Sequence, residues 1–257
     1  MSVNGRLIHG DVLEETVRLL SAAQEANVRI RALGGMAIVL HVGELLHPAF
    51  RREIRDIDLA AAKGDGRRIA TFLADQGYSP NRTFNAMHGA HRLLFYDEPN
   101  ARQIDVFIGR FEMCHALPLT DRLELEPMTL PLAELVMTKL QIVKLNRKDM
   151  LDLYSLLLTH DVAPHDDDTI NSTRIAELCS GDWGLYRTFQ LNLERLEEEA
   201  DLPELTQAEQ ATIRARMHDL WNAIERAPKS AKWKMRARVG DRVRWYQDPD
   251  EVELGGY

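Results

Sequence analysis

Three aspartates in two short apolar runs are the residues of this sequence best suited to bind a metal ion. Asp56 and Asp58 flank the apolar residue Ile57, and strand side chains alternate between two faces, so both carboxylates are expected on one face. Parallel carboxylates repel each other unless a cation lies between them, and Mg²⁺ takes one or two protein carboxylates together with phosphate oxygens and water. A second apolar run presents Asp105, so three aspartates could hold two ions. A strand with aspartates on its solvent face is the competing structural interpretation.

A pair of glycines upstream of the aspartates is suited to receive a phosphate. Gly34 and Gly35 follow an apolar run that ends at Leu33, and helical periodicity begins directly after them at Met36. Bare backbone amides and the N-terminus of a helix both attract anions. The sequence therefore places, in order, a candidate phosphate cradle, a carboxylate pair and a lone carboxylate.

The elements that must position these residues alternate between short apolar runs and helical periodicity, which favours an α/β (α+β) fold. We expect a mixed β-sheet with flanking helices in residues 1–125 and a mostly helical region in residues 126–257. The expected strands are 28–33, 54–61, 91–96 and 102–108, with the last two forming a hairpin around the turn 97–100. The expected helices are 11–26, 36–42, 69–76, 132–143, 150–157, 174–179, 186–199 and 208–224.

Glycines after a first strand, an acidic-apolar-acidic strand and a third acidic strand resemble the pattern of the DNA polymerase beta-like nucleotidyltransferase superfamily. The residues that carry this resemblance are Gly34, Gly35, Asp56, Asp58 and Asp105. It covers the chain from about residue 28 to about residue 158, and the motifs are specific only in combination.

The helical residues that follow are similar to those of the abortive-infection type IV (AbiEii-like) toxin group. Lys139 stands in a lysine-leucine pair, and 146–154 is similar to that group's run of a basic residue followed by Asp-x-x-Asp-Leu. Arg52, four residues before Asp56, also fits this group.

This resemblance implies an enzyme that moves a nucleoside monophosphate from an NTP to a hydroxyl group and releases pyrophosphate. It implies that Asp56, Asp58 and Asp105 are catalytic and bind Mg²⁺, with two ions expected. It also implies a set of nucleotide-binding residues, which are Gly34, Gly35, Arg52, Lys139, Arg147, Asp149 and Asp152. From the helix spacing alone, Asp149 and Asp152 are equally well explained as a structural ion pair, and Lys139 as a solvated lysine.

The acceptor implied by the resemblance is the 3′ end of tRNA, in a toxin-like role with an antitoxin protein as a partner. The basic stretch 226–244, with Trp233 inside it and Trp245 just beyond, combines cations and aromatic rings as an RNA surface does. The same stretch could instead dock on the acidic run 197–201.

Two alternative functions stay open. An antibiotic nucleotidyltransferase, acting on an aminoglycoside or a lincosamide, shares the glycine and paired-aspartate motifs. A catalytically silent homologue that binds nucleotide or a partner protein is suggested by two departures from the family pattern. Ile54 stands where Ser or Thr is usual, and residues 36–55 make a long spacer between the glycines and the aspartates.

Composition excludes several classes of protein. Hydrophobic residues make up 45% of the 257 residues, and 32 basic against 40 acidic residues give a net charge of −8, which is typical of a globular protein without a general affinity for nucleic acid. Cys114 and Cys179 form no metal or disulfide motif. We find no signal or membrane segment and expect a cytoplasmic location.

The remaining histidines and acidic residues are expected to have no chemical role. His88 and His91 lie three apart across a predicted strand start, which does not suit a helical metal site. The run 165–168 is interpreted as a solvated loop, because adjacent side chains do not converge on one ion.

Overall fold

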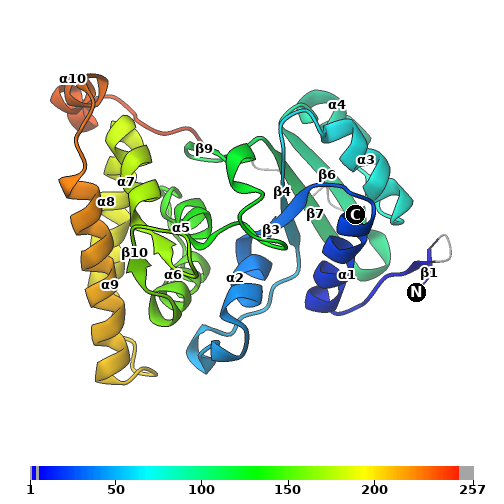
Figure 1. The fold of residues 1–257 in the computed structure, drawn as a ribbon, viewed down its shortest axis with the longest axis horizontal. Helices are drawn as coiled ribbons and strands as arrows, with labels where there is room; N and C mark the ends of the chain where they lie inside the picture. Colours follow the sequence, from blue (N-terminus) through cyan, green and yellow to red (C-terminus); the bar gives the residue numbers. More distant parts are fainter. Residues whose placement is uncertain (1, 4–5, 249–257) are drawn as a thin grey trace.

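The computed structural model describes residues 2–3 and 6–248 of this mixed α/β protein, with most strands in its first half and most helices in its second (Figure 1). The α-helices are α1 Val12–Glu25, α2 Gly34–Val42, α3 Gly66–Asp75, α4 Arg82–His88, α5 Leu132–Leu140, α6 Arg147–Thr159, α7 Ser172–Gly181, α8 Trp183–Glu198, α9 Gln207–Arg226 and α10 Ala231–Val239. The strands are β1 Ser2–Val3, β2 Arg6–Leu7, β3 Ile30–Leu33, β4 Ile57–Ala61, β5 Ser79–Pro80, β6 Arg92–Asp97, β7 Arg102–Ile108, β8 Arg110–Glu112, β9 Ala116–Pro118, β10 Val162–Ala163 and β11 Ile170–Asn171.

A mixed five-stranded sheet in the order β3-β4-β7-β6-β5 carries the predicted aspartates. β4 and β7 are parallel neighbours at its centre, and the register pairs Asp58 with Asp105. Partners in a parallel ladder point to the same face, so these two side chains share one side of the sheet. β3 runs antiparallel to β4 and places Leu33, the last residue before the glycines, opposite Asp58.

The local sequence explains where the principal elements begin and end. Asp11 caps α1 by accepting hydrogen bonds from the backbone N–H groups of Leu13 and Glu14. The hairpin predicted around the turn 97–100 is confirmed, because β6 and β7 pair antiparallel across a short 3₁₀ turn there. Several predicted bounds differ from the structure: β4 begins at Ile57 rather than at residue 54, α5 ends at Leu140 rather than at residue 143, and α8 begins at Trp183 rather than at residue 186.

The two halves of the chain meet at α2, which lies between the sheet and the later helices in Figure 1. α5 and α6 both pack on α2, and one cluster of buried apolar side chains includes Leu59 of β4, Ile38 of α2 and Leu153 of α6. The segment just after residue 125 also joins the sheet, because Ala32 of β3 exchanges backbone hydrogen bonds with Met128 and Leu130. The two parts expected on either side of residue 125 thus share one core.

The basic stretch at the C-terminal end packs on α7 and α8, as Figure 1 shows for α10. The Arg236 guanidinium lies 4.4 Å from the centre of the Trp183 ring, and Arg187 of α8 pairs with Asp241 at 2.8 Å. The acidic run 197–201 is not the docking surface expected for this stretch, because Arg214 of α9 pairs with its carboxylates instead. Across the described residues, no helix combines the length and the apolar character needed to span a membrane.

Candidate active site

The two glycines at the start of α2 are packed against side chains that leave no room for a Cβ atom. Gly34 adopts a φ of +66°, and a Cβ on it would lie 2.2 Å from Oδ2 of Asp58. A Cβ on Gly35 would lie 2.6 Å from Nη2 of Arg52 and 3.0 Å from Cδ1 of Ile54. Glycine is therefore required here both for the backbone conformation and for the close approach of a carboxylate and a guanidinium.

The N-terminus of α2 has no side-chain cap among the described residues, because its N-cap position is occupied by Leu33. The first amide groups of a helix lack intrahelical partners and carry a partial positive charge. This helix end, with Asp58 and Arg52 directly against it, is therefore suited to receive an anion such as a phosphate.

The three predicted aspartates come together near the start of β4, in the middle of the sheet. Asp58 in β4 is half-buried, and its register partner Asp105 in β7 is 3% exposed. Asp56 is exposed and precedes β4, where its carboxylate accepts a long, 3.4 Å hydrogen bond from the backbone N–H of Gln103. Asp56 therefore stands in a loop rather than in the strand that the alternating pattern predicted.

The electrostatic environment of Asp58 lacks a full countercharge. Burial, and then the nearby Asp105 carboxylate, raise the pKa of Asp58 from its ordinary 3.8 to about 7, against the opposing effect of Lys139. A carboxylate held in this state is stabilised by a bound cation, and Mg²⁺ prefers oxygen ligands of this kind. The carboxylates of the exposed Asp56 and the half-buried Asp58 thus form a pair of oxygen donors that fits Mg²⁺.

Asp105 is already paired with a cationic side chain, whereas a two-metal site requires its carboxylate to bind the second ion. The Arg92 guanidinium of β6 contacts both of its carboxylate oxygens, at 2.9 Å from Nε to Oδ1 and 2.5 Å from Nη2 to Oδ2. Burial raises the pKa of Asp105, and Arg92 opposes this effect. A second metal ion would have to compete with Arg92, so the geometry supports one ion at Asp56 and Asp58 better than two.

Lys139 and Arg52 are held in place by two carboxylates of α6. Nζ of Lys139 lies 2.9 Å from Oδ1 of Asp149 and 2.9 Å from Oδ2 of Asp152. Arg52 makes a bidentate pair with Asp152, at 3.0 and 2.7 Å. Burial alone would lower the pKa of Lys139, but the two carboxylates raise it above its ordinary value, so the ammonium group stays charged. Asp149 and Asp152 therefore orient cations, and the interpretation of Lys139 as a solvated lysine is wrong.

The aspartates Asp56 and Asp58 and the cations Arg52 and Lys139 line one pocket, which has a volume of about 430 Å³. Its lining residues are Gly35, Arg52, Glu53, Ile54, Arg55, Asp56, Asp58, Lys139 and Lys148. Arg147, expected to bind nucleotide, is exposed and lies outside this lining, whereas its neighbour Lys148 is part of it. Two of the carboxylates and at least three cations thus face one hollow beside the N-terminus of α2.

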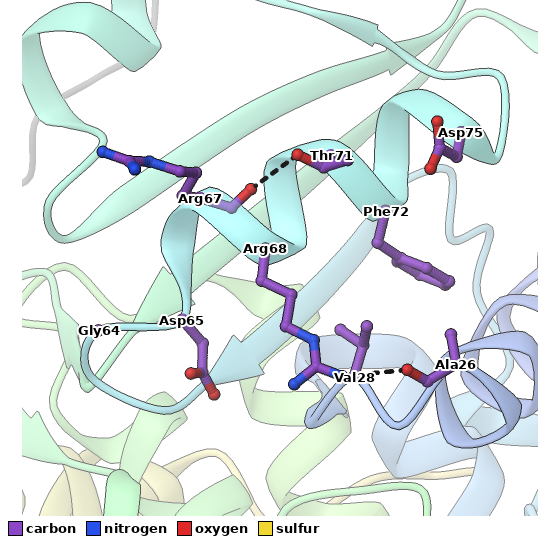
Figure 2. Close-up of a pocket in the computed structure, with 9 residues that line it drawn as sticks. All are labelled: Ala26, Val28, Gly64, Asp65, Arg67, Arg68, Thr71, Phe72 and Asp75. Atoms are coloured by element: carbon purple, nitrogen blue, oxygen red, sulfur yellow. Dashed lines mark hydrogen bonds between the residues drawn. The ribbon is translucent and has the colours of Figure 1, made fainter.

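A larger hollow lies elsewhere and contains none of the predicted site residues. Figure 2 shows this pocket of about 750 Å³ between α3 and the turn that follows α1. Arg68 lies across it and donates a hydrogen bond of 3.2 Å to the carbonyl of Ala26. This pocket is larger than the candidate active site, but it is a surface groove between α3 and the turn that follows α1.

A third hollow, of about 230 Å³, adjoins Arg92. The rings of Phe84 and His88 stack there at 4.6 Å between centroids, and the guanidinium of Arg92 lies 4.9 Å from the centre of the Phe107 ring. His88 and His91, which were expected to have no chemical role, both line this hollow. Arg92 itself was missed, although the hairpin register brings it near Asp105.

In comparisons with known proteins, no family model and no curated sequence matches this chain.

Proposed function

We propose that the chain is a Mg²⁺-dependent nucleotidyltransferase that transfers a nucleoside monophosphate from an NTP to a hydroxyl group. The observation that carries this proposal is the pocket in which Asp56 and Asp58 face Arg52, Lys139 and Lys148 beside an uncapped helix N-terminus. A metal-triphosphate complex combines a positive metal ion with negative phosphates. The carboxylates of this pocket suit the metal ion, and its cations suit the phosphates.

The residues of the pocket divide into two roles. Asp56 and Asp58 would hold Mg²⁺, which when bound neutralises charge on the phosphate oxygens. Lys139 and Arg52 offset the charge of the triphosphate, and they are pre-oriented because Asp152 contacts both of them. Lys148 adds a third cation at the pocket wall.

The proposed reaction is an in-line displacement at the α-phosphorus. The acceptor oxygen forms a bond to this phosphorus, the bond between it and the bridging α–β oxygen breaks, pyrophosphate leaves, and the hydroxyl proton passes to solvent. The cationic side chains Lys139, Arg52 and Lys148 stabilise the negative charge that develops on the leaving group.

An RNA end, specifically the 3′ end of tRNA, is the acceptor that we favour. The hollow lined by Phe84 and His88 adjoins Arg92, which in turn contacts Asp105, so a base stacked on these rings would lie near Asp105. Of the basic stretch 226–244, Lys232, Lys234 and Arg238 remain exposed on α10. Its tryptophans are not free to stack, because Trp245 donates a hydrogen bond to Thr188 and Trp233 packs against Tyr186.

A catalytically silent nucleotide-binding protein is the second candidate, and a specific contact favours it. Arg92 occupies both oxygens of Asp105, and Ile54 packs over Gly35 where a hydroxyl group could otherwise contact phosphate. Under this alternative, Asp56 and Asp58 would still bind a metal-nucleotide complex without turnover.

The test is incubation with Mg²⁺, each of the four α-labelled NTPs and total tRNA. The proposal predicts label on tRNA with wild-type protein, none with Asp58→Asn, and undiminished labelling with the matched control Asp219→Asn, which changes an exposed carboxylate on α9. Nucleotide binding without labelled tRNA, protein or small-molecule acceptor would support the silent protein instead. Label on an aminoglycoside or a lincosamide, but not on tRNA, would replace RNA as the acceptor.

A further inference from the structure

Two histidines and an aspartate converge at the end of α2 that lies away from the glycines. His41 is in the last turn of α2, His160 is the C-cap residue of α6, and Asp168 is in the loop before β11. One ligand atom of each residue lies within 4.8 Å of those of the other two. Nε2 of His160 is 3.7 Å from Oδ1 of Asp168, and the two imidazole rings meet edge to face at 6.1 Å between centroids.

Hydrogen bonds outside the cluster anchor one ring nitrogen of each histidine. Thr159 donates its hydroxyl proton to the carbonyl of Ser155, so the same hydroxyl must accept from Nδ1 of His160, at 2.8 Å. The proton of His160 is then on Nδ1, and the lone pair is on Nε2, the nitrogen that faces Asp168. Hydrogen bonds of this kind, from the second ring nitrogen to a protein oxygen, accompany nearly all metal-binding histidines.

The same reasoning applies to His41. Its Nε2 lies 3.1 Å from the backbone carbonyl of Leu130, and a carbonyl oxygen can only accept a hydrogen bond. The hydroxyl of Thr129 also approaches Nε2 of His41, at 2.7 Å. Each imidazole thus has one nitrogen anchored to the protein, which leaves its second nitrogen for a ligand.

Burial and charge also suit a cation at this position. His160 is 6% exposed. Arg216, a cation that acts on this histidine, is paired with Asp161 and with the carbonyls of Leu157 and Leu158. Asp168 supplies the negative charge, and its side chain is 86% exposed.

We propose that His41, His160 and Asp168 bind a Zn²⁺-type transition metal ion, with water in the remaining position. Two imidazoles and one carboxylate make a ligand set that favours Zn²⁺ over Mg²⁺. Tetrahedral ligands about 2.0 Å from an ion lie about 3.3 Å apart. The separation of 3.7 Å between Nε2 of His160 and Oδ1 of Asp168 is close to this value, and the three ligand atoms all lie within 4.8 Å of one another, so a bound ion would draw them closer together.

This site is separate from the proposed Mg²⁺ site but uses the same two helices. α2 has the glycines at its first residues and His41 in its last turn, while α6 carries Asp149 near its start and His160 at its end. A metal ion at this site would therefore link the C-terminal ends of α2 and α6, whose N-terminal ends line the candidate active site. Its role in the fold is that of a structural clamp between α2, α6 and the 161–169 loop.

The test uses untagged full-length protein and Co²⁺, a spectroscopic substitute for Zn²⁺. The proposal predicts that wild-type protein binds one Co²⁺ with the visible absorption bands of a four-coordinate ion, and that one equivalent of Zn²⁺ removes these bands. Asp168→Asn should weaken Co²⁺ binding by more than about 100-fold, since loss of a ligand exceeds the effect of losing a group that merely supports one. His160→Gln should abolish the bands.

Two controls make the result specific to these residues. His165→Gln/Asp167→Asn changes a second histidine and aspartate in the same loop, whose atoms lie 3.7 Å apart, and should leave Co²⁺ binding unchanged. Asp56→Asn/Asp58→Asn should leave the four-coordinate bands unchanged, although it removes any Co²⁺ bound at the proposed Mg²⁺ site, which separates the two sites. The exposed position of Asp168 makes its variant a surface change, so folding is not at risk. The proposal is overturned if wild-type protein shows no four-coordinate bands that saturate as Co²⁺ is added, or if Asp168→Asn retains the wild-type affinity measured from these bands.

Discussion

Replacement of Asp58 by Asn should stabilise the metal-free protein, and the gain should grow with pH. In the folded protein the pKa of Asp58 is about 7, against an ordinary value of 3.8, because burial and Asp105 disfavour its ionised form. Between these two pH values the folded state therefore binds more protons than the unfolded state, so the stability contributed by this group falls as pH rises through that window and levels off above pH 7. The difference between these two pKa values corresponds to a loss of about 4 kcal/mol from the free energy of unfolding at a pH well above 7.

The assay is urea denaturation of wild-type protein and Asp58→Asn in EDTA, at pH 5 and at pH 8. An Asn side chain does not ionise, so the free energy of unfolding of the variant relative to wild type should increase by about 3 kcal/mol between these pH values. The matched Asp219→Asn variant should shift by no more than about 0.5 kcal/mol, as an exposed surface substitution does. A stability difference that is independent of pH, or a variant less stable than wild type at pH 8, would refute the assignment of Asp58 as an under-compensated carboxylate.

Three further predictions test the rest of the pocket. Lys139→Met should lower the free energy of unfolding by about 3–5 kcal/mol, because it leaves the buried carboxylate of Asp149 without its cation and leaves Asp152 with Arg52 alone. Lys144→Met, at an exposed position, should change it by less than about 0.5 kcal/mol, and urea denaturation of both variants checks this. Gly34→Ala should destabilise the protein more than Gly43→Ala in thermal unfolding, because both glycines have positive φ but only Gly34 has a carboxylate in the space of the new methyl group. Mg²⁺ should raise the melting temperature more at pH 8 than at pH 6, since it must displace the proton of Asp58, and an equal rise at both values would contradict this.

The sequence predicted those parts of the site that local pattern determines. The alternating pattern around Ile57 correctly placed Asp58 in a strand, although Asp56 precedes that strand, and the glycines were correctly expected at the start of a helix. The hairpin was also predictable, because turn residues separate two apolar runs of similar length. These features depend on neighbours within a few residues.

Contacts between distant segments could not be predicted in the same way. The pairing of Arg92 with Asp105 depends on the hairpin register and on which rotamer fits beneath Phe107. The run 165–168 was interpreted correctly as an exposed loop, but the approach of Asp168 to two histidines from α2 and α6 depends on how three elements pack. A single sequence does not show which residues come into contact when they lie more than 100 positions apart in the chain.

The bidentate pair between Arg52 and Asp152 spans 100 positions of the chain and has a consequence for how the protein matures. Contacts of such wide sequence separation form late in folding, because a long loop must close before they contribute any stability. During synthesis, Arg52 and the glycines leave the ribosome well before α6 exists to hold them in place. The nascent chain therefore passes through a stage in which the residues of the central sheet have emerged but the candidate pocket still lacks Asp152, which holds Arg52 and Lys139.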